Sequence, residues 1–218
     1  MTSFGIKMLG ILTMILDHLG FIFFRENIYL RLLGRISFPL FAFQLAIGYS
    51  HSKNKEKHII RMIIFALISQ LPFMVFVSTG APNIGHFLNI GFTLSLGLLG
   101  MYAYENIKQP LIKILSILSV IFLGYLMPID YGYLGVSLCI VFYIIRSNKM
   151  ASMFSSGTLI ILKSIIEKSL VKIPMLGALI PIYSYNGKKG FDNKFTKYFF
   201  YVFYPLHMII FVIIYNLI

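Results

Sequence analysis

Long apolar runs separated by short polar stretches occupy most of this chain of 218 residues. A helix that crosses a bilayer needs roughly 20 mostly apolar residues, because the hydrocarbon core is about 30 Å thick. The runs that approach this length cover residues 4–24, 29–50, 59–77, 87–104, 111–127, 133–146, 152–170, 174–185 and 197–218. The pattern predicts an all-α, polytopic transmembrane helix bundle with about nine membrane helices, forming a single domain over residues 1–218.

Composition supports this prediction, since 58% of the residues are hydrophobic and only 12% are charged. Soluble domains carry about 25% charged residues, because their surfaces face water. So few charges cannot coat a water-facing globule of this size. We therefore expect the lipid bilayer to be the main partner of the chain.

The basic residues gather in alternate connections between the predicted helices. They are Lys53, Lys55, Lys57 and Arg61; Lys108 and Lys113; Arg146 and Lys149; and Lys188, Lys189, Lys194 and Lys197. The intervening connections, residues 78–85 and 128–132, contain no Lys or Arg. Because Lys and Arg concentrate in cytoplasmic loops, we expect a cytoplasmic amino terminus. The net charge of +12 then reflects topology, and nucleic acid is not an expected partner.

The stretch 163–172 departs from this alternation, because nine crossings would place its lysines on the outer side. It covers the end of the predicted helix 152–170, which contains Lys163 and Glu167, and precedes the short predicted helix 174–185. We expect it to be an interfacial or re-entrant segment.

Ionisable side chains inside a membrane helix are informative, since each costs a few kcal/mol or more unless it faces a partner or a cavity. Asp17 and His18 lie in the first helix, where adjacent residues point about 100° apart. Each must therefore find partners on other helices. His18 is our candidate general base, with Asp17 orienting another charged group. A buried ion pair that only locks helices together is the alternative for Asp17.

The second predicted helix combines an arginine with a proline one turn later. Pro39 removes the helical partner of the Arg35 carbonyl, so this helix is expected to kink. Such breaks occur at membrane depth only where they line protein or water. Arg35 is the expected counter-charge of Asp17. Its alternative uses are stabilising an oxyanion, binding a phosphate and snorkelling to the interface.

The last predicted helix repeats this arrangement, with Pro205 between Tyr204 and His207. Because Tyr204 and His207 are three residues apart, they share a helix face. Two membrane histidines and one arginine, each beside a helix-distorting or small residue, indicate a site rather than packing alone. Tyr204 and Asn89 are the candidates for contacting an acceptor, although Asn89 also suits hydrogen bonds between helices.

A glycine-flanked basic turn, residues 185–190, precedes the last helix. Lysines and backbone N–H groups in such a turn can hold phosphates. Lys188, Lys189 and Asn186 are therefore candidates for cofactor binding. The alternative is that these lysines only set the topology.

Several familiar catalytic motifs are missing from the sequence. There is no Walker loop, GxSxG elbow, HExxH pair or Cys/His metal spacing, which argues against an ATP-driven pump, a serine hydrolase or a zinc protease. No metal is expected. Cys139, the only cysteine, lies in an apolar run and is expected to serve packing.

Five short motifs, in the same order along the chain, resemble the TraX family of bacterial membrane proteins. They are Lys7, Met14, Leu16, Asp17 and His18; Gly34, Arg35, Phe38, Pro39, Leu40 and Phe41; Tyr131, Gly132 and Gly135; Tyr185, Asn186, Gly187 and Gly190; and Phe203, Tyr204, Pro205 and His207. The likeness spans the whole chain.

This resemblance implies an activity, since TraX proteins of conjugation systems acetylate the amino terminus of pilin. The family is also similar to membrane acyltransferases that take acetyl-CoA from the cytoplasm. It implies a multi-pass enzyme of the bacterial inner membrane that transfers acetyl from acetyl-CoA to an amine, such as a pilin or peptide amino terminus, or to a hydroxyl. His18, Asp17, Arg35 and His207 would then be catalytic, with His207 sharing the role of base or carrying the acetyl group transiently.

Two other function classes fit the same residues. Broken helices and buried charges also suit the substrate pathway of a transporter, although no internal repeat is visible in the sequence. A non-enzymatic assembly or accessory factor is the other class, in which the polar residues are only structural.

Overall fold

Helices form nearly all of the regular structure in the computed structural model, which describes residues 1–81, 87–191 and 193–218, and only the backbone for residues 194–197. They are α1 (Ser3–Ile22), α2 (Ile28–Gly34), α3 (Ser37–Ser50), α4 (Lys55–Gly80), α5 (Ile90–Asn106), α6 (Pro110–Leu126), α7 (Gly132–Ile144), α8 (Lys149–Ile166), the 3-10 helix η1 (Leu170–Ala178), α9 (Leu179–Tyr183) and α10 (Lys194–Leu217). Within the described ranges, this confirms the predicted all-α bundle.

Five of the described segments are long and apolar enough to cross a membrane, fewer than the nine that the sequence predicted. They are Ser3–Ile22, Ile28–Ser50, Lys55–Gly80, Lys149–Ile166 and Tyr198–Leu217. The 17 residues of α6 and the 13 of α7 measure about 26 and 20 Å at 1.5 Å per residue. Both are shorter than the hydrocarbon core, about 30 Å thick.

The second long span contains the break that its proline predicted. α2 ends at Gly34 and α3 begins at Ser37, with Arg35 and Ile36 between them. Pro39 lies in the first turn of α3, where its missing N–H is tolerated. Pro205, in contrast, lies inside α10, which continues through it.

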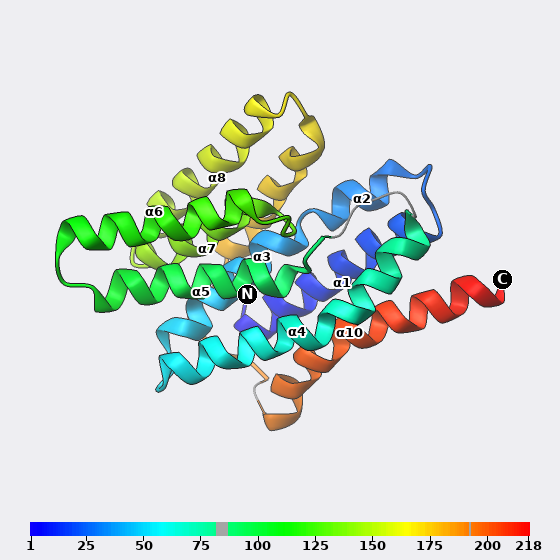
Figure 1. The fold of residues 1–218 in the computed structure, drawn as a ribbon, viewed down its shortest axis with the longest axis horizontal. Helices are drawn as coiled ribbons and strands as arrows, with labels where there is room; N and C mark the ends of the chain where they lie inside the picture. Colours follow the sequence, from blue (N-terminus) through cyan, green and yellow to red (C-terminus); the bar gives the residue numbers. More distant parts are fainter. Residues whose placement is uncertain (82–86, 192) are drawn as a thin grey trace.

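α3 lies at the centre of the bundle (Figure 1). It packs against α1, α5, α7, η1 and α9, while α4 packs against α5 and α10. Large apolar side chains of α3, including Phe38, Leu40 and Phe43, belong to the main buried cluster. α8 and η1 pack against each other as a hairpin at one edge of the bundle.

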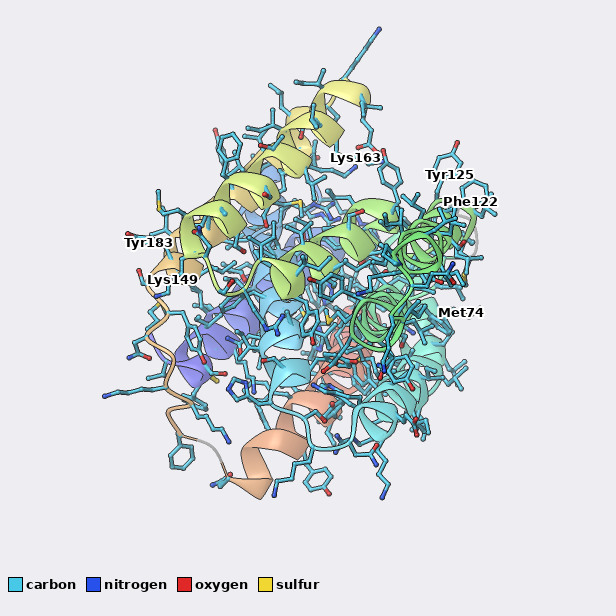
Figure 2. The ribbon with its side chains drawn as sticks, turned by 90° about the vertical axis from the view of Figure 1, so that its left-hand side faces the viewer. Met74, Phe122, Tyr125, Lys149, Lys163 and Tyr183 are labelled. Carbon is cyan, nitrogen blue, oxygen red and sulfur yellow. The ribbon has the colours of Figure 1, made fainter. Side chains whose placement is uncertain are left out.

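The outer surface of the bundle is strongly apolar. Figure 2 shows Met74 of α4 and Phe122 and Tyr125 of α6 at its periphery, and these three side chains are exposed. Contiguous apolar surface of this kind marks a membrane or protein contact. Lipid is its natural solvent here.

The start of the chain is joined to the glycine-flanked turn before α10. The N–H groups of Ser3 and Phe4 donate to the carbonyls of Lys188 and Lys189, at 2.9 and 3.0 Å. Gly187 and Gly190 have φ of 77° and 75°, values that favour glycine. These contacts fix the turn beside the first residues of α1.

Candidate active site

A cavity of about 520 Å³ lies inside the bundle, a size typical of small-molecule sites. Its walls come mainly from α1, α3, α4 and α10, with contributions from the connection before α7 and from the 185–191 segment. The apolar part of the lining includes Phe41, Met62, Phe65, Phe200 and Tyr201.

The two ends of the cavity differ in chemistry. One end is lined by basic groups, Lys7, His51, His58, Arg61 and Lys189. Because His51, Arg61 and Lys189 are exposed, this end is the mouth. Of these five residues, only Lys189 was predicted from the sequence as a site residue, since the others lie in separate predicted helices or at their ends.

The inner end holds a different set of polar side chains, Asp17, His18, Ser37, Asp130 and Tyr131. His18 follows the first residue of α1, Ser3, by 15 residues, which is about 22 Å along a helix. The inner end is thus separated from the mouth by most of the length of α1.

His18 and His207 form a direct hydrogen bond, in which His18 Nδ1 and His207 Nε2 are 2.6 Å apart. This contact joins α1 to α10, so His18 finds its partner on another helix, as the sequence predicted. The other ring nitrogen of His207, Nδ1, lies 2.9 Å from the carbonyl oxygen of Phe203. We call these two residues the histidine pair.

The Phe203 carbonyl determines which nitrogens of the histidine pair carry protons. A carbonyl only accepts hydrogen bonds, so Nδ1 of a neutral His207 must donate to it and Nε2 must accept. His18 Nδ1 then donates to His207, and His18 Nε2 keeps its lone pair. His18 lines the cavity, as a proton acceptor for a bound molecule must.

Aromatic rings enclose the histidine pair. The His18 ring lies 4.9 Å from that of Phe76, and the His207 ring stacks on that of Phe203 at 5.1 Å. Phe211 meets His207 edge to face at 5.7 Å. These rings restrict water and hold both imidazoles in place.

Asp17 pairs with Arg31, not with Arg35 as the sequence suggested. Arg31 Nη1 lies 3.0 Å from Asp17 Oδ2 and also donates to the Asp17 carbonyl at 3.1 Å. The prediction was wrong because α2 lies directly on α1: a Cβ at Gly34 would come 2.2 Å from the Asp17 Cβ. That contact places Arg31, one turn before Arg35, beside the carboxylate. Asp17 Oδ1 is buried without a hydrogen-bond partner.

Arg35 instead faces Tyr131. Its guanidinium carbon lies 5.8 Å from the centre of the Tyr131 ring, which stacks on Phe38 at 4.1 Å. Arg35 Nε is buried and makes no hydrogen bond. Tyr131 has φ of 60°, a left-handed conformation that is unfavourable for a bulky residue.

Asp130 and Tyr131 were not predicted from the sequence as site residues. The glycines that follow them, Gly132 and Gly135, are typical of close helix packing. The signal that could have found them was an aspartate in a connection between two apolar helices. A Cβ at Gly135 would come 2.5 Å from a methyl carbon of Thr93, so the packing interpretation also describes this segment.

The two candidates for acceptor binding lie in different places. Tyr204 lines the cavity, with its ring 5.5 Å from that of Phe65. Asn89 lies outside the lining. Its amide nitrogen donates to the Ala66 carbonyl at 2.7 Å, and its oxygen accepts from the Gly91 N–H at 2.8 Å. Asn89 caps α5 and joins it to α4.

The three cofactor candidates are also divided. Lys189 lines the mouth, whereas Lys188 and Asn186 do not line the cavity. Asn186 Oδ1 accepts a hydrogen bond from the Lys188 N–H at 3.1 Å, which stabilises the turn itself. In the part of the chain that the structure describes, no three His, Cys, Asp or Glu residues are grouped as metal ligands.

Comparison with known proteins shows which family this chain matches. The family model of the TraX protein matches residues 4–215. The chain is 29% identical over 231 residues to the probable fimbrial assembly protein FimC, serogroup H1, of Dichelobacter nodosus, which covers 95% of this chain and 93% of that protein. It is 26% identical over 148 residues to an uncharacterized protein of Rickettsia prowazekii (strain Madrid E), covering 66% and 56%. No solved structure matches significantly.

Proposed function

Because the chain belongs to the TraX family, we propose that this multi-pass membrane protein is an acetyltransferase that moves an acetyl group from acetyl-CoA to an amine or a hydroxyl. The observation that carries the proposal is the position of His18, which lines the inner end of a cavity with a basic mouth and is hydrogen-bonded to His207.

The mouth of the cavity suits the phosphates of acetyl-CoA, and the inner end suits its thioester. Its phosphates would lie at the mouth, where Lys7, Arg61 and Lys189 supply positive charge. The pantetheine arm of acetyl-CoA would lie along the apolar walls of the cavity, which are formed by residues such as Met62 and Phe65. The thioester would then reach the inner end, beside His18.

His18 would act as the general base. The acceptor nitrogen or oxygen attacks the thioester carbonyl carbon while His18 Nε2 takes its proton; the new bond forms, the carbon–sulfur bond breaks, and the proton passes to the departing thiolate. Arg35 is not part of the lining but contacts Tyr131, which is, and its positive charge there would stabilise the oxyanion of the tetrahedral intermediate through space. His207 would hold His18 in the required tautomer.

The distribution of charge supports an orientation in the membrane. The mouth of the cavity and the basic connections lie on the side of the bundle where α1, α4 and α8 begin, at Ser3, Lys55 and Lys149. The positive-inside rule places that side in the cytoplasm, where acetyl-CoA is available. The amino terminus would then be cytoplasmic in the bacterial inner membrane.

The acceptor is suggested by the relative named as a probable fimbrial assembly protein. A pilus subunit, or another peptide with a free amino terminus, is the acceptor that we propose. The same name also favours a second function, a pilus assembly factor without covalent chemistry. The two differ in whether acetyl-CoA is consumed.

Purified protein in detergent, supplied with radiolabelled acetyl-CoA and a panel of peptide amines and hydroxyl compounds, tests the enzyme. We expect transfer by the native protein and a loss of about 100-fold or more in His18→Ala, because general bases contribute 10²–10⁴-fold. Lys108→Ala, an exposed change outside the cavity, is the matched control and should keep full activity.

Three results would contradict parts of this proposal. Full activity in a folded His18→Ala protein would remove His18 from the mechanism. No transfer by the folded native protein to any probe would favour the assembly factor. Solute flux through vesicles without acetyl-CoA consumption would favour a transporter.

A further inference from the structure

We infer that the middle of the cavity is a binding site for the two amide groups of the pantetheine arm, formed by Gln44 of α3 and His58 of α4. The inference rests on the proposed function and adds to it the residues that recognise the arm between the phosphates and the thioester. Two buried polar atoms carry it, one on each residue, which are unpaired among the residues that the structure describes.

Gln44 supplies the first of these atoms. Its side chain lines the cavity, although only 7% of the residue is exposed. Its Oε1 accepts a hydrogen bond from the Ser3 hydroxyl at 2.6 Å, but its Nε2 is buried and has no acceptor within the described ranges. If the amide were turned over, Nε2 would donate to Ser3 and Oε1 would be left unpaired, because a hydroxyl can donate or accept. In either orientation Gln44 keeps one buried atom for a hydrogen bond with a bound molecule.

The start of the chain holds Gln44 in place. Ser3, whose hydroxyl contacts Gln44, donates its backbone N–H to the carbonyl of Lys188 at 2.9 Å. The glycine-flanked turn 185–190 therefore positions Gln44 through Ser3. Because this side chain is already held at one oxygen, it loses less conformational freedom when a ligand binds to its other atom.

His58 supplies the second atom. It lines the cavity and is 9% exposed, and its Nδ1 is buried with no hydrogen-bond partner in the described part of the chain. It differs in this from His51, Arg61 and Lys189 of the mouth, which are exposed. Nδ1 of a neutral imidazole donates or accepts according to the tautomer. It can therefore meet either the N–H or the C=O of an amide.

The spacing of the two residues matches that of the two amides. A Cβ at Gly48 would lie 3.7 Å from Cε1 of His58, so His58 lies beside Gly48. Gly48 follows Gln44 by four residues, which places both on one face of α3, about 6 Å apart. The carbonyl carbons of the two pantetheine amides are joined by four bonds, about 5 Å in an extended chain. Each residue can therefore meet one amide.

The depth of Gln44 also suits the arm. α3 begins at Ser37, which lines the inner end, and is followed by His51, which lines the mouth. Gln44 is seven residues from each of them, or about 10 Å along the helix. The pantetheine arm joins the phosphates to the thioester, so its amides must pass this point. Apolar walls alone would leave these amides without hydrogen bonds, which is unfavourable.

Binding measurements in detergent test the site without any turnover. The probes are CoA and its phosphoadenosine diphosphate portion, which keeps the phosphates but lacks the arm, and calorimetry measures both affinities. Gln44→Met keeps the length of the side chain and removes its polar atoms. We expect this variant to bind CoA roughly 3- to 10-fold more weakly, which corresponds to the net value of a hydrogen bond. Its affinity for the nucleotide portion should equal that of the native protein.

Two substitutions of His58 form a matched pair. His58→Phe keeps an aromatic ring without a hydrogen-bonding atom, so it should weaken CoA binding by a similar factor. His58→Asn places an amide close to the position of Nδ1 and should keep most of the native affinity. Equal losses in the two variants would show that the hydrogen bond of Nδ1 is not the cause.

The other outcomes separate this inference from the proposed function. Native CoA affinity in both Gln44→Met and His58→Phe would overturn the inference and leave the proposed function standing. An equal loss of affinity for CoA and for its nucleotide portion would also overturn it, since the effect would not belong to the arm. A raised KM for a peptide acceptor with unchanged CoA affinity would assign the two residues to the acceptor instead. Absence of CoA binding by the folded native protein would contradict the proposed function itself.

Discussion

At the scale of single residues, the protein depends on a chain of hydrogen bonds with a fixed direction. The Phe203 carbonyl orients His207, and His207 orients His18. Each link is set by whether the atom can donate or only accept. The result is one imidazole nitrogen, His18 Nε2, that is free to accept a proton.

This chain of hydrogen bonds predicts different outcomes for two substitutions of His207. His207→Ala removes the group that orients His18, and we expect kcat to fall about 100-fold, since small misplacements have effects of that size. A glutamine can accept from His18 and donate to Phe203, so His207→Gln should recover much of the loss. Steady-state kinetics check this, and KM for acetyl-CoA should stay unchanged in both. Equal losses in the two variants would contradict the positioning role.

Residue types alone identify part of the candidate site. Asp17, His18 and His207 are ionisable groups in apolar helices, which is sufficient to make them candidates. The choice between Arg31 and Arg35 as partner of Asp17 could not be made from their spacing, because the break between α2 and α3 changes which side chain faces α1.

The mouth was less predictable than the inner end. Its basic groups come from α1, α4 and the connections around them. Lysines and arginines at the ends of membrane helices usually set topology. Only the fold shows that residues as distant as Lys7, Arg61 and Lys189 surround one opening.

At the scale of elements, the contact between α1 and α2 holds the inner end together. An added Cβ at position 34 would lie only 2.2 Å from that of Asp17, so Gly34→Ala must push α2 away from α1. We expect it to lower the free energy of unfolding by about 1–3 kcal/mol, as overpacking does. Thermal unfolding in detergent measures the change.

Gly48→Ala is the matched control for this substitution. Its added Cβ would lie 3.7 Å from His58, an ordinary contact, and alanine favours the helix. Its midpoint of unfolding should stay the same or rise. Equal destabilisation by the two substitutions would show that crowding at Asp17 is not the cause.

The turn between α8 and η1 carries a pH-dependent contact. Burial alone would raise the pKa of Glu167, but hydrogen bonds and charges from Lys163 and Lys172 outweigh it and lower the pKa below its usual value. A lowered folded-state pKa stabilises the turn above the ordinary pKa of glutamate, and the stabilisation is lost as the pH falls through the folded value.

We therefore expect the hydrogen-exchange protection factors of residues 167–172, which are corrected for the slower chemical exchange in acid, to fall as the pH drops below about 4.5, the ordinary glutamate value. In Glu167→Gln the protection factors of this segment should already be low at neutral pH and should vary less with pH. A Gln variant with the native pH dependence would show that another group is responsible.

At the scale of the whole molecule, charge is concentrated at one end of the cavity. In the proposed function Lys189 contacts the phosphates of acetyl-CoA, so Lys189→Ala should raise KM for acetyl-CoA several-fold, as loss of a charge-assisted contact does. kcat should change little. Added salt should weaken binding to the native protein more than to this variant.

Lys108→Ala removes the same charge from another connection and serves as the comparison. Its KM should match that of the native protein. If both variants raise KM equally, the effect comes from the overall charge of the surface and not from the mouth.

The number of membrane crossings was the least predictable global feature. A window of apolar residues does not tell a helix that crosses lipid from one that packs inside a bundle. α7 illustrates the difficulty, since Leu138, Cys139 and Phe142 are fully or nearly fully buried among protein side chains. Its 13 residues are apolar where they face these neighbours, and the helix is shorter than the hydrocarbon core is thick.

The unequal lengths of the outer helices have a consequence for the surrounding lipid. α4 has 26 residues and α6 only 17, and apolar side chains of both are exposed. The hydrocarbon core of a bilayer of one thickness cannot match the lengths of both helices. The layer of lipid around the protein must therefore become thinner beside α6, or α4 must tilt. Lipids with shorter acyl chains should therefore relieve the mismatch on the α6 side and favour the folded bundle.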